Sequence, residues 1–178
     1  SQNALLVLAV SREWGISKKS VLNKLDNFSS PQKNRFYQMK VGRHIVIDDS
    51  YNANPVSFRS ALSELFRNPN YPDNKVVILG DMYELGDVSD EEHDKLLDEL
   101  IKLNELKLTI LVGERLKKAY MRLKDPHQNN NIVHIERKSE FPYEQFKKSL
   151  KGDSVILIKG SRGMKMERFL EIIIGNIQ

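Results

Sequence analysis

The sequence has 178 residues, 40% of them hydrophobic, and its 28 Lys and Arg against 24 Asp and Glu give a formal net charge of +4. This length suits one domain with a sizeable core and part of another. Cysteine is absent, which excludes disulfides and thiolate chemistry and fits a reducing compartment. The apolar run 4–10 is too short to cross a bilayer, so we expect neither a signal peptide nor membrane insertion. The positive charge favours anionic ligands, but lysines are scattered among acids, so we do not expect a nucleic-acid partner.

Two helices are predicted before residue 29. The first, 3–14, is apolar nearly all round as far as Val10, which indicates burial against something larger. Gly15 ends it, and Ser17 is an N-cap residue for the second. The polar stretch 29–34 then breaks the helical pattern and is the best candidate for a domain boundary. We therefore assign residues 1–30 to the end of a neighbouring domain and residues 31–178 to a domain of their own.

The chain from residue 35 onward has the pattern of an α/β domain. Strands at 35–40 and 43–48, joined by a tight turn at Val41-Gly42, predict an antiparallel hairpin. Strands and helices then alternate, which predicts a Rossmann-like, mostly parallel sheet with helices on both faces. The later strands are expected at 75–79, 108–112, 132–135 and 154–158.

Two carboxylates and two amides follow the second strand of this hairpin. The apolar run Ile45–Ile47 stops at Asp48 and Asp49, and Asn54 precedes Pro55 as a helix N-cap does. These groups lie where a parallel strand passes into a helix, the edge of open α/β sheets at which ligands bind. Because adjacent strand residues face opposite sides, we expect one aspartate to hold local backbone. The other is expected to accept from sugar hydroxyls or a metal-bound water, unless the segment is only a polar turn.

A second polar turn, Lys159–Lys165, follows the last predicted strand and is expected to emerge beside the first. Its Gly160 and Gly163 permit close approach of a ligand or positive φ, and the next helix is expected to begin here with free N–H groups. Arg162 can bind a carboxylate or phosphate through two hydrogen bonds. The turn therefore predicts an anion site, with ordinary helix capping as the alternative. It is not a Walker P-loop, because no G-x-x-x-x-G-K-[ST] sequence occurs in the chain.

Three weaker features lie between these turns. The segment 80–86 either lines a pocket at the ligand edge or packs through Met82. Ser89 and Glu92 have the spacing of a capping box. His93 lies among acidic residues, and we expect a solvated helix face there rather than a metal site, since no second histidine stands at ligand spacing.

Three segments in series carry a family resemblance over essentially the whole chain: Asp48–Pro55 (DDSYNANP), Leu79–Gly86 (LGDMYELG) and Lys159–Arg168 (KGSRGMKMER). They resemble the C-terminal domain of the Mur ligase family. The D-N-P-R motif of the branch that adds a diamino acid is absent, which favours the dipeptide-adding branch. Residues 1–30 then resemble the C-terminal end of the ATP-binding central domain.

The resemblance implies a function for the complete protein. It implies a cytoplasmic ligase of peptidoglycan precursor synthesis, and so a part in cell wall biogenesis, cell shape and cell division. With ATP and Mg²⁺ it joins D-alanyl-D-alanine to the UDP-N-acetylmuramoyl tripeptide through an acyl phosphate, aided by its own central and N-terminal domains. The metal ligands and the catalytic lysine belong to the central domain, so this chain alone is expected to fold without turning over ATP. The alternatives are a related amide ligase of the folylpolyglutamate or cyanophycin type, and a non-enzymatic basic α/β binding module.

The resemblance also implies site residues, with no catalytic residue and no metal ligand among them. Asp49 is assigned to the ribose hydroxyls, and Arg35 to the nucleotide near the interdomain hinge. The family usually has glycine before Arg35, where this chain has Asn34; asparagine tolerates a left-handed backbone, so the turn is expected to survive. The full ATP-binding set is Asn3, Arg35, Asp49, Asn52 and Asn54, and the substrate-binding set is Tyr51, Lys159, Ser161 and Arg162.

Overall fold

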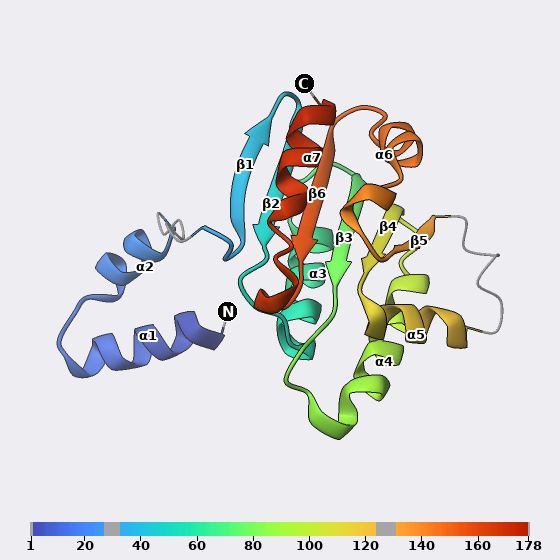
Figure 1. Cartoon of the computed structure of the whole chain (residues 1–178). Helices are drawn as coiled ribbons and strands as arrows, with labels where there is room; N and C mark the ends of the chain where they lie inside the picture. Colours follow the sequence, from blue (N-terminus) through green and yellow to red (C-terminus); the bar gives the residue numbers. More distant parts are fainter. Residues whose placement is uncertain (1, 27–32, 124–130, 178) are drawn as a thin grey trace. The chain divides into compact units, whose positions relative to one another are not determined.

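The computed structural model describes residues 2–26, 33–123 and 131–177 (Figure 1). The chain divides into two compact units, Ser1–Pro31 and Gln32–Gln178. In the part of the chain that the structure describes, no helix is long and apolar enough to cross a membrane.

The first unit is a pair of helices, α1 (Gln2–Glu13) and α2 (Lys18–Asp26). Gly15 has φ +69° between them, and the Ser17 hydroxyl accepts from the Ser20 N–H at 3.2 Å, as the predicted cap requires. Two apolar side chains of α1 are largely exposed: Leu5 is 68% exposed and Leu6 65%.

The second unit is built on a six-stranded sheet in the order β1-β2-β6-β3-β4-β5. Only the β1–β2 pair is antiparallel among the pairs of the described strands; each other neighbouring pair is parallel. This arrangement confirms the predicted fold class. The strands are β1 (Tyr37–Val41), β2 (His44–Asp49), β3 (Asn74–Gly80), β4 (Leu106–Val112), β5 (Ile132–Ile135) and β6 (Ser154–Lys159).

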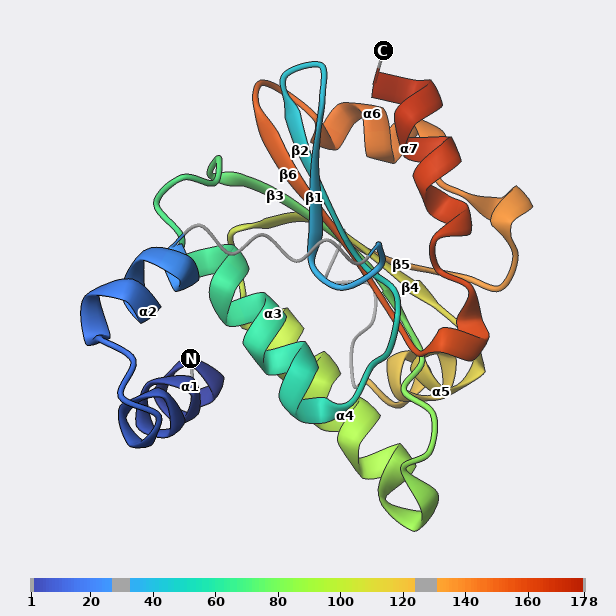
Figure 2. The same cartoon turned by 90° about the vertical axis from the view of Figure 1, so that its left-hand side faces the viewer.

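Helices cover both faces of the sheet (Figure 2). One core lies under α3, α4 and α5, with Phe58 and Leu97 at its centre; the other lies under α6 and α7, with Phe146 and Phe169. The central strands β3 and β6 are buried on both sides, as their continuous apolar runs require. The helices are α3 (Pro55–Arg67), α4 (Ser89–Ile101), α5 (Glu114–Arg122), α6 (Tyr143–Ser149) and α7 (Arg168–Ile177), and the short 3₁₀ turns are η1 (Gly86–Val88), η3 (Lys138–Glu140) and η4 (Arg162–Met164).

Two expectations about α4 are wrong. The capping box does not form, because the chain enters the helix from η1 and the N-cap position falls on Val88. His93 is fully buried rather than solvated. Its Nε2 accepts from the Met82 N–H at 3.0 Å, and its Nδ1 lies 2.6 Å from the Ser89 carbonyl oxygen, so the ring joins the start of α4 to the loop after β3.

Candidate functional site

Three loops meet at the carboxyl edge of the parallel strands β2, β6 and β3, which Figure 1 shows side by side. The register places Asp49 beside Lys159 on one flank of β6 and Leu79 beside Lys159 on the other. The loops that follow Asp49 and Lys159 therefore emerge as neighbours along one rim, as predicted.

An ion pair between Lys159 and Asp49 holds the centre of this rim. The Lys159 ammonium is 2.6 Å from Asp49 Oδ2 and also donates to the Asn52 carbonyl at 3.1 Å. Only 1% of the Lys159 side chain is exposed, against 18% for Asp49. The second carboxylate oxygen of Asp49 accepts from the Phe36 N–H at 3.0 Å. The pair thus fixes the orientation of Asp49 and ties β6 to the loop after β2 and to the chain that enters β1.

Asp48 turns to the other face of the sheet, and its carboxylate holds local backbone. Its Oδ1 accepts from both the N–H and the hydroxyl of Ser50, at 3.2 and 2.5 Å. Burial is the main cause that raises the pKa of Asp48; the Ser50 hydrogen bonds oppose it, while the nearby charges of Glu167 and Asp49 add to it. The two aspartates thus have separate environments, one buried and one at the rim.

Arg35 and Tyr51 stack at the open end of the rim. The guanidinium carbon of Arg35 lies 3.9 Å from the Tyr51 ring centroid, and 44% of Tyr51 is exposed. The Tyr51 N–H donates to the Asn34 carbonyl at 2.8 Å, and Asn34 has φ +69°. Asparagine therefore adopts the left-handed turn that was expected at this position.

The two amides after Tyr51 are exposed and serve the local backbone. Asn54 Oδ1 accepts from the Ser57 N–H at 2.8 Å and caps α3 directly before Pro55, as predicted. Asn52 Oδ1 accepts from the Ala53 N–H at 2.8 Å. The rim here is thus a short capped turn whose polar side chains reach solvent.

Ser161 lies inside the protein rather than at its surface. It is 3% exposed; its hydroxyl accepts from the Tyr83 N–H at 2.7 Å and lies 3.4 Å from the Ala53 carbonyl. Its own N–H donates to the Asp81 carbonyl at 3.1 Å. Ser161 therefore fastens all three loops to one another.

The turn around Arg162 differs from the expectation in two ways. The 3₁₀ turn η4 follows Ser161 and α7 begins only at Arg168, so no long helix starts at this loop. Gly160 and Gly163 do not have left-handed φ; a Cβ on Gly160 would lie 2.6 Å from Met166, and one on Gly163 would lie 2.8 Å from the Tyr83 ring. Both glycines therefore serve internal packing. Arg162 and Lys165 are exposed cations of the turn, and the Arg162 side chain is 58% exposed.

Asp81 has a role that the sequence reasoning missed. Its Oδ1 accepts from the Leu116 N–H at 2.9 Å and its Oδ2 from the Arg115 N–H at 3.1 Å, so it caps the start of α5. These partners lie more than thirty positions away, and no local pattern indicates the contact. Asp81 therefore links the segment 80–86 to α5, next to the loops of the candidate site.

Asn3 lies in α1, and its side chain is outside the described residues. The other eight predicted positions lie in the second unit. The Lys159 ammonium joins Asp49 to the Asn52 carbonyl, and Arg35 stacks on Tyr51, whereas the hydrogen bonds of Asn54 stay within the start of α3. Among the residues described, no group of three or more His, Asp or Glu side chains is arranged to hold a metal ion.

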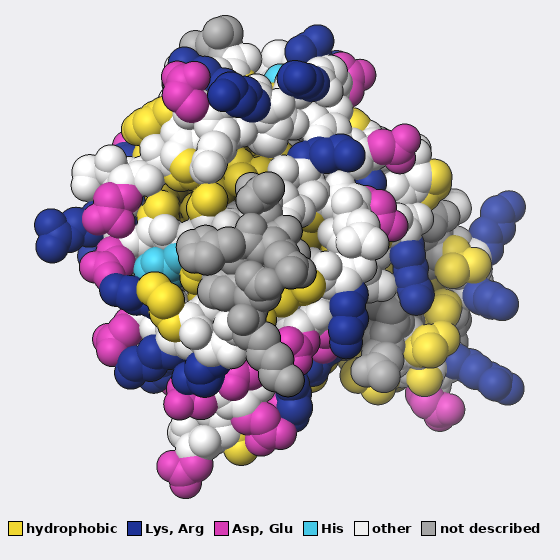
Figure 3. Space-filling model, turned by 90° about the vertical axis from the view of Figure 1, so that its right-hand side faces the viewer, with side chains coloured by type: hydrophobic (Ala, Val, Ile, Leu, Met, Phe, Trp, Pro, Cys, Tyr) yellow, Lys and Arg dark blue, Asp and Glu magenta, His cyan; other side chains and the backbone are white. Residues whose placement is uncertain are grey.

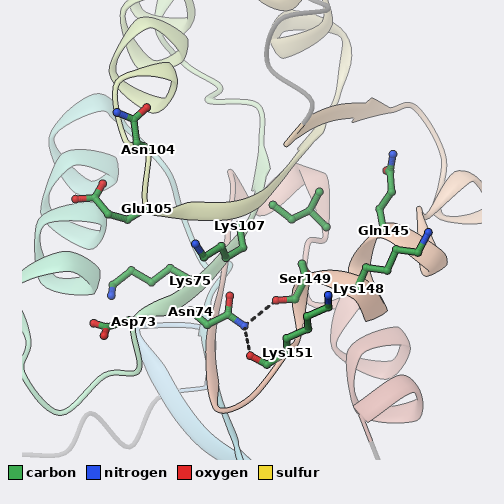
Figure 4. A pocket seen from close by; sticks show the side chains of 11 residues that line it. Asp73, Asn74, Lys75, Asn104, Glu105, Lys107, Gln145, Lys148, Ser149 and Lys151 are labelled. Atoms are coloured by element: carbon green, nitrogen blue, oxygen red, sulfur yellow. Dashed lines mark hydrogen bonds between the residues drawn. The ribbon is translucent and has the colours of Figure 1, made fainter.

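A cavity of about 870 Å³ lies at the opposite edge of the sheet, where β3 and β4 begin. Figure 4 shows that its lysines do not converge: Lys75 and Lys107 point to one side and Lys148 to the other. The Lys75 ammonium donates to the Pro72 carbonyl at 3.0 Å, so one of its hydrogens is already used within the protein. This cavity contains none of the predicted site residues.

Surface charge is mixed on the face that Figure 3 shows, with basic and acidic side chains interspersed. Ion pairs also join α5 to its neighbours: Arg122 lies 2.7 Å from Asp94 of α4, and Lys117 pairs with Glu136 after β5. Much of the positive charge of the second unit is therefore matched locally.

Comparison with known proteins agrees with this geometry. Residues 34–162 match the family model described as Mur ligase, glutamate ligase domain. The UDP-N-acetylmuramoyl-tripeptide–D-alanyl-D-alanine ligase of Borreliella burgdorferi is 33% identical over 174 residues, which cover 96% of this chain and 35% of the relative. A crystal structure of MurF from Acinetobacter baumannii matches with a TM-score of 0.81 and 27% identity, covering 98% of this chain and 37% of that one.

A further match is the MurF ligase of Thermotoga maritima in complex with ADP, with a TM-score of 0.71 and 25% identity, covering 96% of this chain and 36% of that one. The chain thus spans about a third of the length of the relatives it matches.

Proposed function

Because this chain belongs to the Mur ligase family, we propose that it is the C-terminal domain of a UDP-N-acetylmuramoyl-tripeptide–D-alanyl-D-alanine ligase. The observation that carries the proposal is that the loops after Asp49 and Lys159 leave the sheet side by side at its ligand edge, with Lys159 Nζ 2.6 Å from Asp49 Oδ2. The relative from Borreliella burgdorferi bears this enzyme name, and the Thermotoga maritima structure contains ADP.

The proposed reaction forms an amide bond in cytoplasmic peptidoglycan precursor synthesis, and so serves cell shape and division. The γ-phosphoryl group of ATP passes to the carboxylate of the UDP-N-acetylmuramoyl tripeptide, giving an acyl phosphate and ADP. The amine of D-alanyl-D-alanine attacks the acyl carbon and loses a proton, and phosphate leaves. Holding both reactants against each other and excluding water from the acyl phosphate is the contribution expected of a closing domain.

The nucleotide side of the proposed site is the rim from Arg35 to Asn54. Asp49 presents a carboxylate of fixed orientation to the ribose hydroxyls, since Lys159 and the Phe36 N–H hold it. Arg35, stacked on Tyr51, offers a cation beside an exposed aromatic face. Asn52 and Asn54 complete the ATP-binding set in this unit, and Asn3 is assigned to it from the first unit.

The substrate side of the proposed site is the turn after β6 together with Tyr51. Arg162 is exposed and suits the carboxylate of the dipeptide or a neighbouring phosphate. Lys159 and Ser161 belong to the same subsite, and their burial indicates that they act by holding the turn in place. Tyr51 lines the cleft between the two subsites.

We assign residues 1–30 to the end of the central domain, with residues 31–178 as the C-terminal domain. The exposure of Leu5 and Leu6 on α1 supports this, because such apolar surface is usually covered in a complete domain. Following the family resemblance, the ligands of Mg²⁺ are assigned to the central domain. The 178-residue chain alone is accordingly expected to show no ATP turnover.

Steady-state kinetics of the full-length enzyme test this function. Asp49→Asn keeps an acceptor for the Phe36 N–H and removes the charge, and is expected to raise the KM for ATP about tenfold. Arg162→Ala is expected to raise the KM for D-alanyl-D-alanine by a similar factor. Lys148→Ala, at an exposed position of α6 outside the proposed site, is the control and is expected to leave both constants unchanged.

Two outcomes contradict the proposal. Unchanged kinetics in both variants show that these residues do not form the site. Preference of the full-length enzyme for glutamate or another single amino acid over the dipeptide assigns it instead to the folylpolyglutamate or cyanophycin type of ligase.

A further inference from the structure

We propose that Asn34 is a positioning residue: together with Glu167 it holds the Arg162 guanidinium so that one edge faces an incoming anion. The inference rests on the proposed function for the identity of that anion, the carboxylate of the dipeptide or a neighbouring phosphate. The geometry that supports it is independent of that identity.

Asn34 bridges a buried carboxylate and an exposed guanidinium. Its side-chain nitrogen donates to Asp48 Oδ2 at 3.2 Å, and its side-chain oxygen accepts from Arg162 Nη1 at 3.2 Å. Only this orientation of the amide satisfies both neighbours, since the reverse would set oxygen against oxygen and nitrogen against nitrogen. The Asn34 carbonyl is also fixed, because it accepts from the Tyr51 N–H at 2.8 Å.

Glu167 holds the same nitrogen of Arg162 from the other side. Its Oε1 accepts from Nη1 at 3.0 Å, so both acceptors act on one end of the guanidinium. Within the described part of the chain, Nε and Nη2 of Arg162 have no hydrogen-bond partner. Arginine binds carboxylates and phosphates through two parallel N–H groups, and the Nε–Nη2 edge is the pair that remains. Fixing the side chain beforehand lowers the entropy lost when the anion binds.

The backbone of Asn34 makes this inference testable with little risk to folding. At φ +69° most side chains are strained, whereas glycine adopts this conformation freely. Asn34→Gly therefore removes the amide and leaves the turn. Asn104→Gly, in the exposed turn between α4 and β4, is the matched control.

The first measurement is direct and needs no catalysis. NMR of the Arg162 Nε–H in the 178-residue chain, assigned with Arg162→Lys, reports how freely the guanidinium rotates. We expect Asn34→Gly to speed up its rotation and hydrogen exchange about threefold to tenfold, as the loss of one hydrogen bond of ordinary strength at an exposed side chain predicts. In Asn104→Gly, the rotation of the Arg162 guanidinium and the exchange of its Nε–H are expected to be those of the wild type.

The second measurement separates positioning from general stability. In the full-length enzyme, Asn34→Gly is expected to raise the KM for D-alanyl-D-alanine about threefold to tenfold, with kcat and the KM for ATP unchanged. In an Arg162→Ala background Asn34→Gly is expected to cause no further rise in this KM, since the side chain that Asn34 positions is absent. Glu167→Gln is expected to raise the KM for D-alanyl-D-alanine as Asn34→Gly does. Glu171→Gln, at an exposed position in the first turn of α7, is expected to leave it unchanged.

The inference is overturned if Asn34→Gly leaves the Arg162 Nε–H signal unchanged. It is also overturned if the substitution raises the KM equally with and without Arg162, because that is the behaviour of a structural residue. A full-length protein without ligase activity refutes the proposed function, and the NMR result then still decides the role of Asn34.

Discussion

At the scale of single residues, the buried ion pair of Lys159 and Asp49 is the contact on which the rim most depends. Removing one partner of such a pair leaves the other charge without compensation, which costs more than the pair contributes. We expect Lys159→Met to lower the free energy of unfolding by about 3 kcal/mol, measured by urea denaturation. Lys165→Met, in the exposed part of the same turn, is the control and is expected to change it by less than about 0.5 kcal/mol. Equal changes in the free energy of unfolding for the two variants would show that the Lys159–Asp49 ion pair does not stabilise the fold.

Asp48 gives a prediction about pH. Because burial raises its pKa in the folded state, the folded protein holds this proton more tightly than the unfolded chain. Between the unfolded and the folded pKa, stability therefore falls as the pH rises, and the cost of burying the charge is fully present above the folded pKa.

The measurement is the difference in unfolding free energy between the wild type and Asp48→Asn, from urea denaturation at several values between about pH 4 and pH 7. We expect this difference to favour the wild type most at the acidic end and to decline as the pH rises. Asp87→Asn, at an exposed position, is the control. A difference that is flat or grows with pH contradicts the assignment.

At the scale of elements, two glycines, one before α5 and one within α7, are expected to respond in opposite ways to substitution by alanine. Gly113, before α5, has φ +114°, and a Cβ there would lie 2.5 Å from the Asp81 carboxylate that caps the helix. Gly175 lies within α7 with open space around it. We expect Gly113→Ala to destabilise the protein by about 2 kcal/mol and Gly175→Ala to stabilise it by about 0.5 to 1 kcal/mol, both measured by urea denaturation. A Gly113→Ala variant as stable as the wild type would contradict the cap assigned to Asp81.

The elements that sequence reasoning predicted are those that depend on local periodicity. Continuous apolar runs predicted β3 and β6, and the Asn54-Pro55 pair predicted the start of α3. Contacts between separate segments explain the wrong expectation about His93 and the unforeseen role of Asn34. The acidic neighbours of His93 in the sequence indicate a solvated side chain, yet its ring is buried in α4 and accepts from the Met82 N–H in the loop after β3. The sequence shows only that asparagine replaces the family's usual glycine at Asn34. Its side-chain partner, Arg162, lies far along the chain.

At the scale of the whole molecule, both large hydrophobic clusters lie in one of the two compact units. The two hydrophobic clusters that pack against the sheet are made of residues between 36 and 177. Helix α7 belongs to one of them through Phe169, Ile172 and Ile173. The first unit contains the helix pair α1 and α2.

We therefore expect residues 32–178 to fold without residues 1–31, with a single cooperative urea transition and near-ultraviolet circular dichroism typical of packed aromatic side chains. The m-value should fall in proportion to the smaller surface exposed on unfolding. Residues 32–165 are the contrasting variant, because this shorter chain lacks α7 and the apolar side chains it adds to the core. Loss of cooperativity is expected only in that variant. A chain 32–178 that unfolds without a cooperative transition would show that the first helix pair is part of the folding unit.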